Sequence, residues 1–300
     1  MLENTLSDIA SNSRPATKAT FGDWLVLAKP GIVALVIVSA LGGLYLGGAT
    51  SADTVLILFT LSGLAITTAG SAILNNYIDR DIDKLMPRTA KRGLAAGIVK
   101  PKQALIVGLT FVLSGAALHV AFVNNLTAVA TLVAAFGYVV VYTLWMKRTT
   151  PWANQVGGIA GAMPPLIGFI AASNAVTVEA MILFLIVALW QQPHALSLAL
   201  KYRDQYADAK VPVIPVAKGV PATKLRILLY TIILLPVSLM PYYASMAGTI
   251  YLWSAIVTGI IFLFMAANFY RSEEKCNMKL FFYSIIYLTI IFTAMVVDAV

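Results

Sequence analysis

Long apolar runs recur along the whole chain and are separated by short polar connections. Each run is about 20 residues long, the length that an α-helix needs to cross the hydrocarbon core of a bilayer. Within each run the apolar residues follow one another instead of alternating with polar ones, which argues against a transmembrane β-barrel. We therefore predict an all-α polytopic membrane protein. Its nine expected transmembrane helices cover residues 25–46, 54–77, 103–122, 126–146, 153–172, 178–200, 225–244, 249–270 and 280–298.

The cations mark one side of the predicted bundle. With nine spans, all 21 Lys and Arg residues fall in the N-terminal segment or in connections on the same side. The opposite connections, around LGGATSAD, FVNNLT, AASNAVTVEA and YYASMAG, contain none. Because cation-rich connections stay in the cytoplasm, we expect a bacterial inner-membrane protein with a cytoplasmic N-terminus and a periplasmic C-terminus. The formal net charge of +8 then reflects topology, and no nucleic-acid partner is expected.

Composition agrees with a membrane-embedded chain. It is 60% hydrophobic and 11% charged, whereas a soluble domain carries about 25% charged residues. Residues 1–23 are polar and lack the apolar core of a signal peptide, so we expect a flexible cytoplasmic tail. Residues 24–300 are expected to form a single transmembrane domain. Cys276 is the only cysteine, which excludes an intrachain disulfide and a thiolate metal cluster.

Polar residues follow the second predicted span in a helical pattern. Asn75, Asp79 and Asp83 are spaced i, i+4, i+8, so on a helix each lies only about 40° around the axis from the one before it and the three share a face. Carboxylates near hydrocarbon need a cation, and an oxygen-only ligand set suits Mg²⁺, which also takes substrate phosphates as ligands. The alternative is a solvated helix end with local ion pairs, in which Asp79 or Asp81 pairs with Lys84.

A second acidic pair lies at the cytoplasmic end of the sixth span. Asp204 and Asp208 repeat the i, i+4 spacing. Two such acidic helix ends on one side of the membrane could hold Mg²⁺ ions around a diphosphate and neutralise the charge that develops as it leaves. Taken alone, this segment would be an amphipathic loop helix.

His194 lies within the sixth predicted span, beside Trp190. A histidine at membrane depth faces the bundle interior. It could ligate a haem iron, orient a substrate or shuttle protons, or it could be a structural residue bonded to a neighbouring helix. Lys29, at the inner start of the first span, could either snorkel to the interface or reach the polar, phosphate-binding cap that the two acidic segments would form.

These stretches resemble a known family. NNYIDRDIDKLMPRT is similar to the first signature of the UbiA superfamily of intramembrane prenyltransferases, the N-x-x-x-D-x-x-x-D pattern. The likeness covers nearly the whole chain from about Trp24. LAKPGI, YTLWMKRTTPWANQVGGIAGAMPPLIG, LWQQPHALSLAL and VPVIPVAKG resemble the branch that farnesylates haem. The second motif departs from the usual D-x-x-x-D context, and this leaves open whether Asp204 or Asp208 contacts metal.

The resemblance implies a nine-helix bundle around a central cavity. It implies Mg²⁺-dependent transfer of farnesyl from farnesyl diphosphate to a vinyl group of haem b, giving haem O, with a haem A synthase as a downstream partner. The expected catalytic and metal-binding residues are Asn75, Asp79, Asp83, Asp204 and Asp208. The candidate diphosphate contacts are Lys29, Arg80, Lys84, Arg88, Lys147, Arg148, Lys201 and Arg203. The candidate haem contacts are His194, Trp190 and Tyr142.

Two other functions compete with haem farnesylation. The same machinery could prenylate a quinone precursor or another aromatic acceptor, which would not need His194 as an iron ligand. A transporter would place polar groups midway along several spans and show internal repeats. Here the acids lie at one side, and no clear repeat is seen.

Overall fold

The computed structural model describes residues 19–300, and the part of the chain that it describes is almost entirely helical. Most of the predicted tail lies outside these residues, but its end does not. Thr20 caps the first described helix by accepting from the backbone N–H of Asp23, whose carboxylate accepts from the backbone N–H of Thr20. The first described helix therefore starts at Phe21, within the stretch predicted as the tail. The helices are α2 (Phe21–Ala28), α3 (Pro30–Leu46), α4 (Thr54–Leu85), α5 (Pro101–Phe122), α6 (Asn125–Phe136), η1 (Gly137–Met146), α7 (Lys147–Thr149), α8 (Ala153–Ser173), α9 (Val178–Lys201), α10 (Arg203–Asp208), α11 (Ile214–Ala217), α12 (Gly219–Tyr243), α13 (Thr249–Arg271) and α14 (Met278–Val297).

Within residues 19–300, eight helices are long and apolar enough to cross a membrane, and α2 with α3 would count as a ninth, bent span. This confirms the predicted all-α, multi-pass architecture. The first span was predicted as one run over 25–46, but it bends by 47°. The break is at Lys29, whose backbone is left-handed with φ 53°. Pro30 explains the position, because a proline disfavours helical backbone at the residue before it.

The second span continues well beyond the predicted residue 77. α4 is 32 residues long and ends at Leu85, just before Pro87, which agrees with the role of proline as a helix terminator. The extension is helical throughout, so the polar residues at its end keep the regular i, i+4 geometry.

The fourth span is not a regular α-helix. Its second half, η1, is a π-helix over Gly137–Met146. The Thr143 hydroxyl donates to the carbonyl of Tyr138 at 2.7 Å, five residues back. π-Helical segments are rare and occur frequently at functional sites, and this one carries Tyr138, Tyr142 and Thr143 towards the interior.

Glycines allow the helices of the central layer to approach closely. α3 packs against α8, and a side chain at Gly43 would overlap the carbonyl oxygen of Pro165. Gly157 likewise allows a close approach, because a side chain there would overlap the ring of Tyr142. Pro164, also in α8, is buried within a helix that continues past it.

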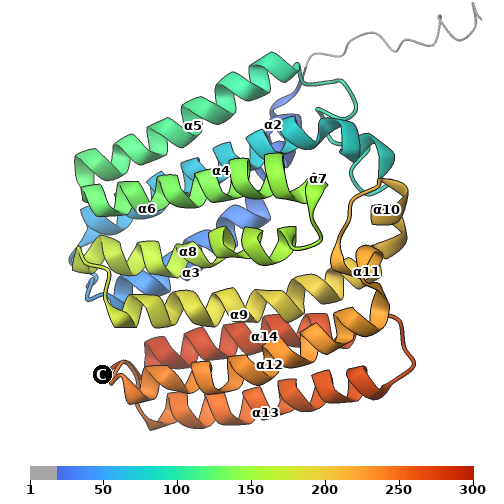
Figure 1. Ribbon diagram of the computed structural model, residues 1–300. Coiled ribbons are helices and arrows are strands. Elements are labelled where there is room, and N and C mark those ends of the chain that lie inside the picture. The colour runs from blue at the N-terminus through green and yellow to red at the C-terminus, as the bar shows by residue number, and fades with distance from the viewer. Residues whose placement is uncertain (1–18) are drawn as a thin grey trace, which may run out of the picture.

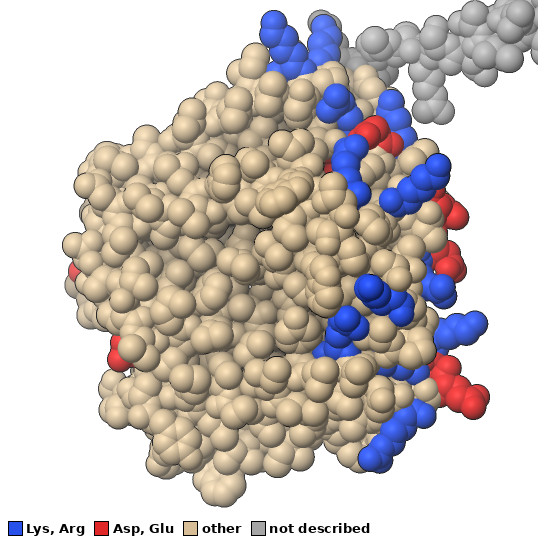
Figure 2. Space-filling view, viewed as in Figure 1, with Lys and Arg blue, Asp and Glu red and all other residues tan. Residues whose placement is uncertain are grey.

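The helices lie side by side from α5 at one edge to α13 at the other, and the short helices α7, α10 and α11 gather at one end (Figure 1). The C-terminus lies at the opposite end. Lys and Arg side chains cluster at the end that carries the short helices, while the broad faces between the ends show no charged side chains in this view (Figure 2). This separation matches the predicted division into a cation-rich side and a cation-free side.

The crossing of α3 and α8 gives a stability prediction. Gly43→Ala should lower the free energy of unfolding by about 1–3 kcal/mol or more, because the new methyl group meets backbone. The adjacent Gly42→Ala is the control, since its nearest neighbour would be Phe292 at an ordinary 3.5 Å. Denaturant titration in mixed micelles measures both. Equal stability of the two variants would contradict the close α3–α8 contact.

Candidate functional site

Three polar side chains share one buried face at the end of α4 that lies on the cation-rich side of the bundle. Asn75 is 4% exposed, Asp79 is 1% exposed and Asp83 is 2% exposed. The predicted common face is therefore confirmed, and the solvated helix end is wrong. Burial of two carboxylates is costly unless each is paired and hydrogen-bonded, so the neighbouring side chains decide what this face can bind.

Three cations from different parts of the chain reach this face. Lys147 Nζ lies 2.5 Å from Asp79 Oδ2, and Arg92 Nη1 lies 2.8 Å from Asp83 Oδ2. Lys29 Nζ donates to Asn75 Oδ1 at 2.6 Å. The left-handed backbone at Lys29 separates α2 from α3 at the point where the side chain turns towards α4. Neither carboxylate pairs with Lys84, the partner expected for an isolated helix.

The π-helix completes this network. Asn75 Nδ2 donates to Asp79 Oδ2 at 2.9 Å and to Thr143 Oγ1 at 3.1 Å. Since the Thr143 hydroxyl proton is donated to Tyr138, its oxygen is free to accept from Asn75. The amide of Asn75 is thereby oriented with its oxygen towards Lys29.

The oxygen atoms on this face suit a hard cation. Asp79 Oδ1 is fully buried and has no hydrogen-bond partner within residues 19–300. A buried carboxylate oxygen without a partner is expensive, and a metal ion is one partner that would compensate it. Asn75 Oδ1 and the Asp83 carboxylate lie on the same face, and oxygen-only donors of this kind are those that Mg²⁺ prefers. The residues present therefore fit a magnesium ion.

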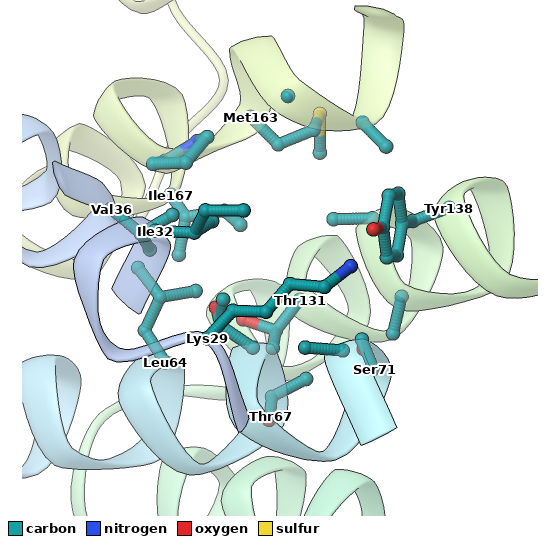
Figure 3. A pocket seen from close by; sticks show the side chains of 17 residues that line it. Lys29, Ile32, Val36, Leu64, Thr67, Ser71, Thr131, Tyr138, Met163 and Ile167 are labelled. Carbon is teal, nitrogen blue, oxygen red and sulfur yellow. The ribbon is translucent and has the colours of Figure 1, made fainter. Parts of the chain in front are cut away.

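An apolar cavity of about 160 Å³ adjoins this face. Its lining comes from α3, α4, α6, η1 and α8, and Lys29 is its only charged lining residue. Figure 3 shows the Lys29 side chain running across the cavity with its ammonium group towards the Tyr138 ring. The cavity can thus take an apolar chain whose charged end faces Lys29 and Asn75.

The structure does not bring Arg80 and Arg148 to the buried acids. Arg148 binds the exposed carboxylate of Asp81 through two hydrogen bonds of 2.7 Å. The Arg80 guanidinium lies 4.6 Å from the centre of the Tyr77 ring. Both arginines line a separate hollow of about 350 Å³. Lys147 and Arg148 are adjacent in sequence, yet only Lys147 contacts the face with Asn75.

The second acidic pair is placed differently from the first. Asp204 and Asp208 lie on α10, are exposed, and make no ion pair within the described part of the chain. α10 and the residues after it still join α4, since Val211 and Val213 pack against Ile82. The connections after α4 and α9 therefore lie together as a polar cap. The structure buries only its first acidic pair, Asp79 and Asp83.

The remaining predicted cations lie around this cap. The Tyr202 ring lies between Arg88, at 5.1 Å, and Lys201, at 5.4 Å. This contact joins the connection after α4 to the one after α9. Lys84 is exposed and Arg203 is half-buried, and neither contacts an acid within residues 19–300.

Two of the three predicted haem contacts meet in the structure, and the third stacks on a different ring. His194 stacks on Trp190 in α9, with ring centres 4.9 Å apart. Tyr142 stacks instead on Tyr138 within the π-helix, at 5.8 Å. The other histidine, His119, is buried between Thr60 and Thr131, as expected for a structural residue.

Sequence reasoning missed three residues as site components. Arg92 is one of several cations that follow the second span, and its place near Asp83 depends on the fold of residues 86–100. Thr143 lies inside the YTLWMKR stretch, which was itself a signal. Tyr138 and Thr143 could be placed only once the π-helix was known, since a regular helix would turn them to other directions.

Known proteins resemble this chain along most of its length. The UbiA prenyltransferase family model matches residues 36–289. A protein of Aquifex aeolicus named protoheme IX farnesyltransferase is 47% identical over 93% of this chain and 95% of its own length. A Pseudomonas putida protein named protoheme IX farnesyltransferase 1 is 43% identical over 94% of this chain and 96% of its own length.

Solved structures share the fold. A structure of digeranylgeranylglyceryl phosphate synthase has a TM-score of 0.79 at 18% identity, covering 92% of this chain and 97% of that one. A UbiA homologue from Archaeoglobus fulgidus bound to GPP and Mg²⁺ has a TM-score of 0.63 at 19% identity, covering 91% and 99%. At these identities the likeness establishes a common helical architecture.

Lys147 and Arg148 offer a matched test of the site's electrostatics. Lys147→Met should lower the free energy of unfolding by about 3–5 kcal/mol, because it leaves the buried Asp79 without its cation. Arg148→Met should cost less than about 1 kcal/mol, because its partner Asp81 is 62% exposed. Denaturant titration in micelles gives both values, and similar losses would contradict the pairing described.

Proposed function

Because this chain belongs to the UbiA prenyltransferase family and is a transferase, we propose that it transfers a farnesyl group from farnesyl diphosphate to a vinyl group of haem b, giving haem O. The observation that carries this proposal is the buried Asn75–Asp79–Asp83 face, surrounded by cations and adjoining an apolar cavity. A diphosphate with a long apolar tail matches both halves of that arrangement. The names of the relatives support haem as the acceptor.

Asn75, Asp79 and Asp83 would hold Mg²⁺ in this proposal. The A. fulgidus neighbour is described with GPP and Mg²⁺ bound, which supports the choice of ion. When bound, Mg²⁺ neutralises charge that develops on the leaving diphosphate. Asp204 and Asp208, exposed on the neighbouring α10, are proposed as further metal ligands at the rim of the site.

The cations of the site bind the diphosphate. Lys29, Lys147 and Arg92 already lie within hydrogen-bond distance of the acidic face, and their N–H groups can turn from protein oxygens to phosphate oxygens. The exposed cations of the cap attract the anionic substrate from solution. These are Lys84, Arg88, Lys201 and Arg203.

The cavity then controls the carbon chemistry. The bond between farnesyl C1 and the diphosphate oxygen breaks, and the diphosphate keeps the electron pair. Aromatic faces stabilise the allylic cation, and Tyr138 lines the cavity beside Lys29. The terminal vinyl carbon of haem attacks C1, and water adds to the resulting haem-side cation with release of a proton. The apolar walls exclude water from the first cation.

Haem is proposed to lie against the α9–α14 face that carries His194 and Trp190. His194 Nε2 has no hydrogen-bond partner within the described residues, while Nδ1 is bonded to Ser284. A neutral imidazole with one free nitrogen is a suitable axial ligand for haem iron. Tyr142 stacks on Tyr138, which lines the cavity, so we propose that it lies nearer the farnesyl group than the iron.

The setting proposed for this reaction is the bacterial inner membrane. The cation-rich end of the bundle would face the cytoplasm, and the C-terminus would face the periplasm. We propose that the helices form one transmembrane domain in the lipid bilayer. A haem A synthase would consume the product.

A reconstitution assay tests the function as a whole. Purified protein in lipid vesicles receives haem b, farnesyl diphosphate and Mg²⁺, with and without a chelator, and the extracted haems are read by mass spectrometry. We expect a metal-dependent haem that is heavier by one farnesyl group and one water. Unchanged haem from folded protein would contradict the proposal, and prenylation of a quinone precursor under the same conditions would identify the competing acceptor.

Two neighbouring aspartates test the metal–diphosphate assignment. Asp79→Asn should abolish turnover and Mn²⁺ binding measured by electron paramagnetic resonance, since it removes a buried anionic ligand. Asp81→Asn should retain both, because Asp81 pairs with Arg148 on another face. We also expect Asn75→Ala and Asp83→Ala to abolish turnover in folded protein. Near wild-type activity of a folded Asp79→Asn protein would rule out the assignment.

A further inference from the structure

α14 holds the His194 ring by one edge and one face. Ser284 lies opposite His194, and the distance from its Oγ to His194 Nδ1 is 2.8 Å. Its backbone carbonyl accepts from Trp190 Nε1 at 2.5 Å. Ser284 is fully buried, so this single residue of α14 binds two neighbouring side chains of α9 without competition from water.

The hydroxyl proton of Ser284 is already committed. Ser284 Oγ lies 2.6 Å from the carbonyl oxygen of Phe281, which can only accept. The hydroxyl therefore donates to Phe281 and accepts from His194. It follows that neutral His194 carries its proton on Nδ1 and its lone pair on Nε2.

Two aromatic rings fix the plane of the imidazole. Trp190 stacks on one side with ring centres 4.9 Å apart and a tilt of 22°. Phe281 also stacks on the imidazole, at 4.4 Å and 26°. The ring can neither rotate nor flip without breaking these contacts and the bond to Ser284. The Nε2 edge is the one left without a hydrogen bond within residues 19–300, and it is not among the enclosed unpartnered atoms.

We propose that Ser284 is a positioning residue that fixes the tautomer and ring orientation of His194, so that the Nε2 lone pair is presented to the iron of the haem substrate. This inference rests on the proposed function. Metal-bound histidines generally donate their second N–H to a partner that orients the ring, and loss of that partner costs about 10–100-fold in affinity. Here that partner lies 90 residues away in sequence.

Comparing the binding of ferric haem with that of metal-free porphyrin distinguishes a positioning role of Ser284 from a role in packing alone. Ferric haem b and metal-free protoporphyrin IX are titrated into the full-length protein in nanodiscs, and the Soret band and affinity are recorded. Ser284→Ala should weaken ferric haem binding roughly 10–100-fold and shift its Soret band, while metal-free porphyrin binds as in wild type. Equal weakening of both ligands, or no change in either, would overturn the proposal.

Further variants keep the test decisive if Ser284→Ala is poorly folded. Ser284→Thr retains a hydroxyl and Ser284→Val has the same shape without one, so only Val should lose ferric haem affinity. Ser254→Ala is the matched control, since this serine donates to a carbonyl of its own helix, Ile250, on an exposed face. Indistinguishable Thr and Val variants would refute the role of the hydroxyl.

A double-variant cycle shows whether Ser284 acts through His194. In a His194→Ala background, Ser284→Ala should have no further effect on ferric haem affinity; an undiminished effect there would overturn the proposal. If His194→Ala leaves the Soret band unchanged while the protein still farnesylates haem, this inference fails and the proposed function stands. If the protein does not farnesylate haem, the proposed function itself fails.

Discussion

The burial of two carboxylates at the end of α4 is the constraint on which the rest of the cation-rich end of the bundle depends. Burying the carboxylates of Asp79 and Asp83 is costly unless each has a cation beside it. The cations come from three different segments: the break before α3, the connection after α4, and the residue that follows the π-helix. The neutralising groups therefore tie these segments together, and the same groups would meet an anionic substrate.

This arrangement gives the site one polar, charged end and one apolar end. The polar network stops at Asn75, and the cavity beyond it has Lys29 as its only charged lining residue. An apolar chain can enter that space without facing unpaired backbone N–H and C=O groups, because every wall is a helix. In the proposed reaction, the groups that bind the charged diphosphate and the cavity that holds the carbon chain would thus be separated by little more than one turn of α4.

The nine spans and the shared face of Asn75, Asp79 and Asp83 could be predicted because both depend on periodicity alone. The pairing of cations with acids could not be predicted. Lys147 and Arg148 are adjacent in sequence but contact different faces of α4, and only the π-helix decides which of them reaches Asp79. The extended contact between α9 and α14 could not be predicted from the sequence either. His194 was identified as a polar residue in a span, but the serine that bonds it lies 90 residues later and has no local signal of its own.

The π-helix also limits how this segment can change in length. Each π-turn contains about one residue more than an α-turn, so a single deletion within Gly137–Met146 would allow regular helix to form. Every residue after the deletion would then rotate about the helix axis, carrying Lys147 away from Asp79. Deletion or insertion of one residue here would disturb the site more than many substitutions. The site therefore constrains the number of residues between Tyr138 and Lys147.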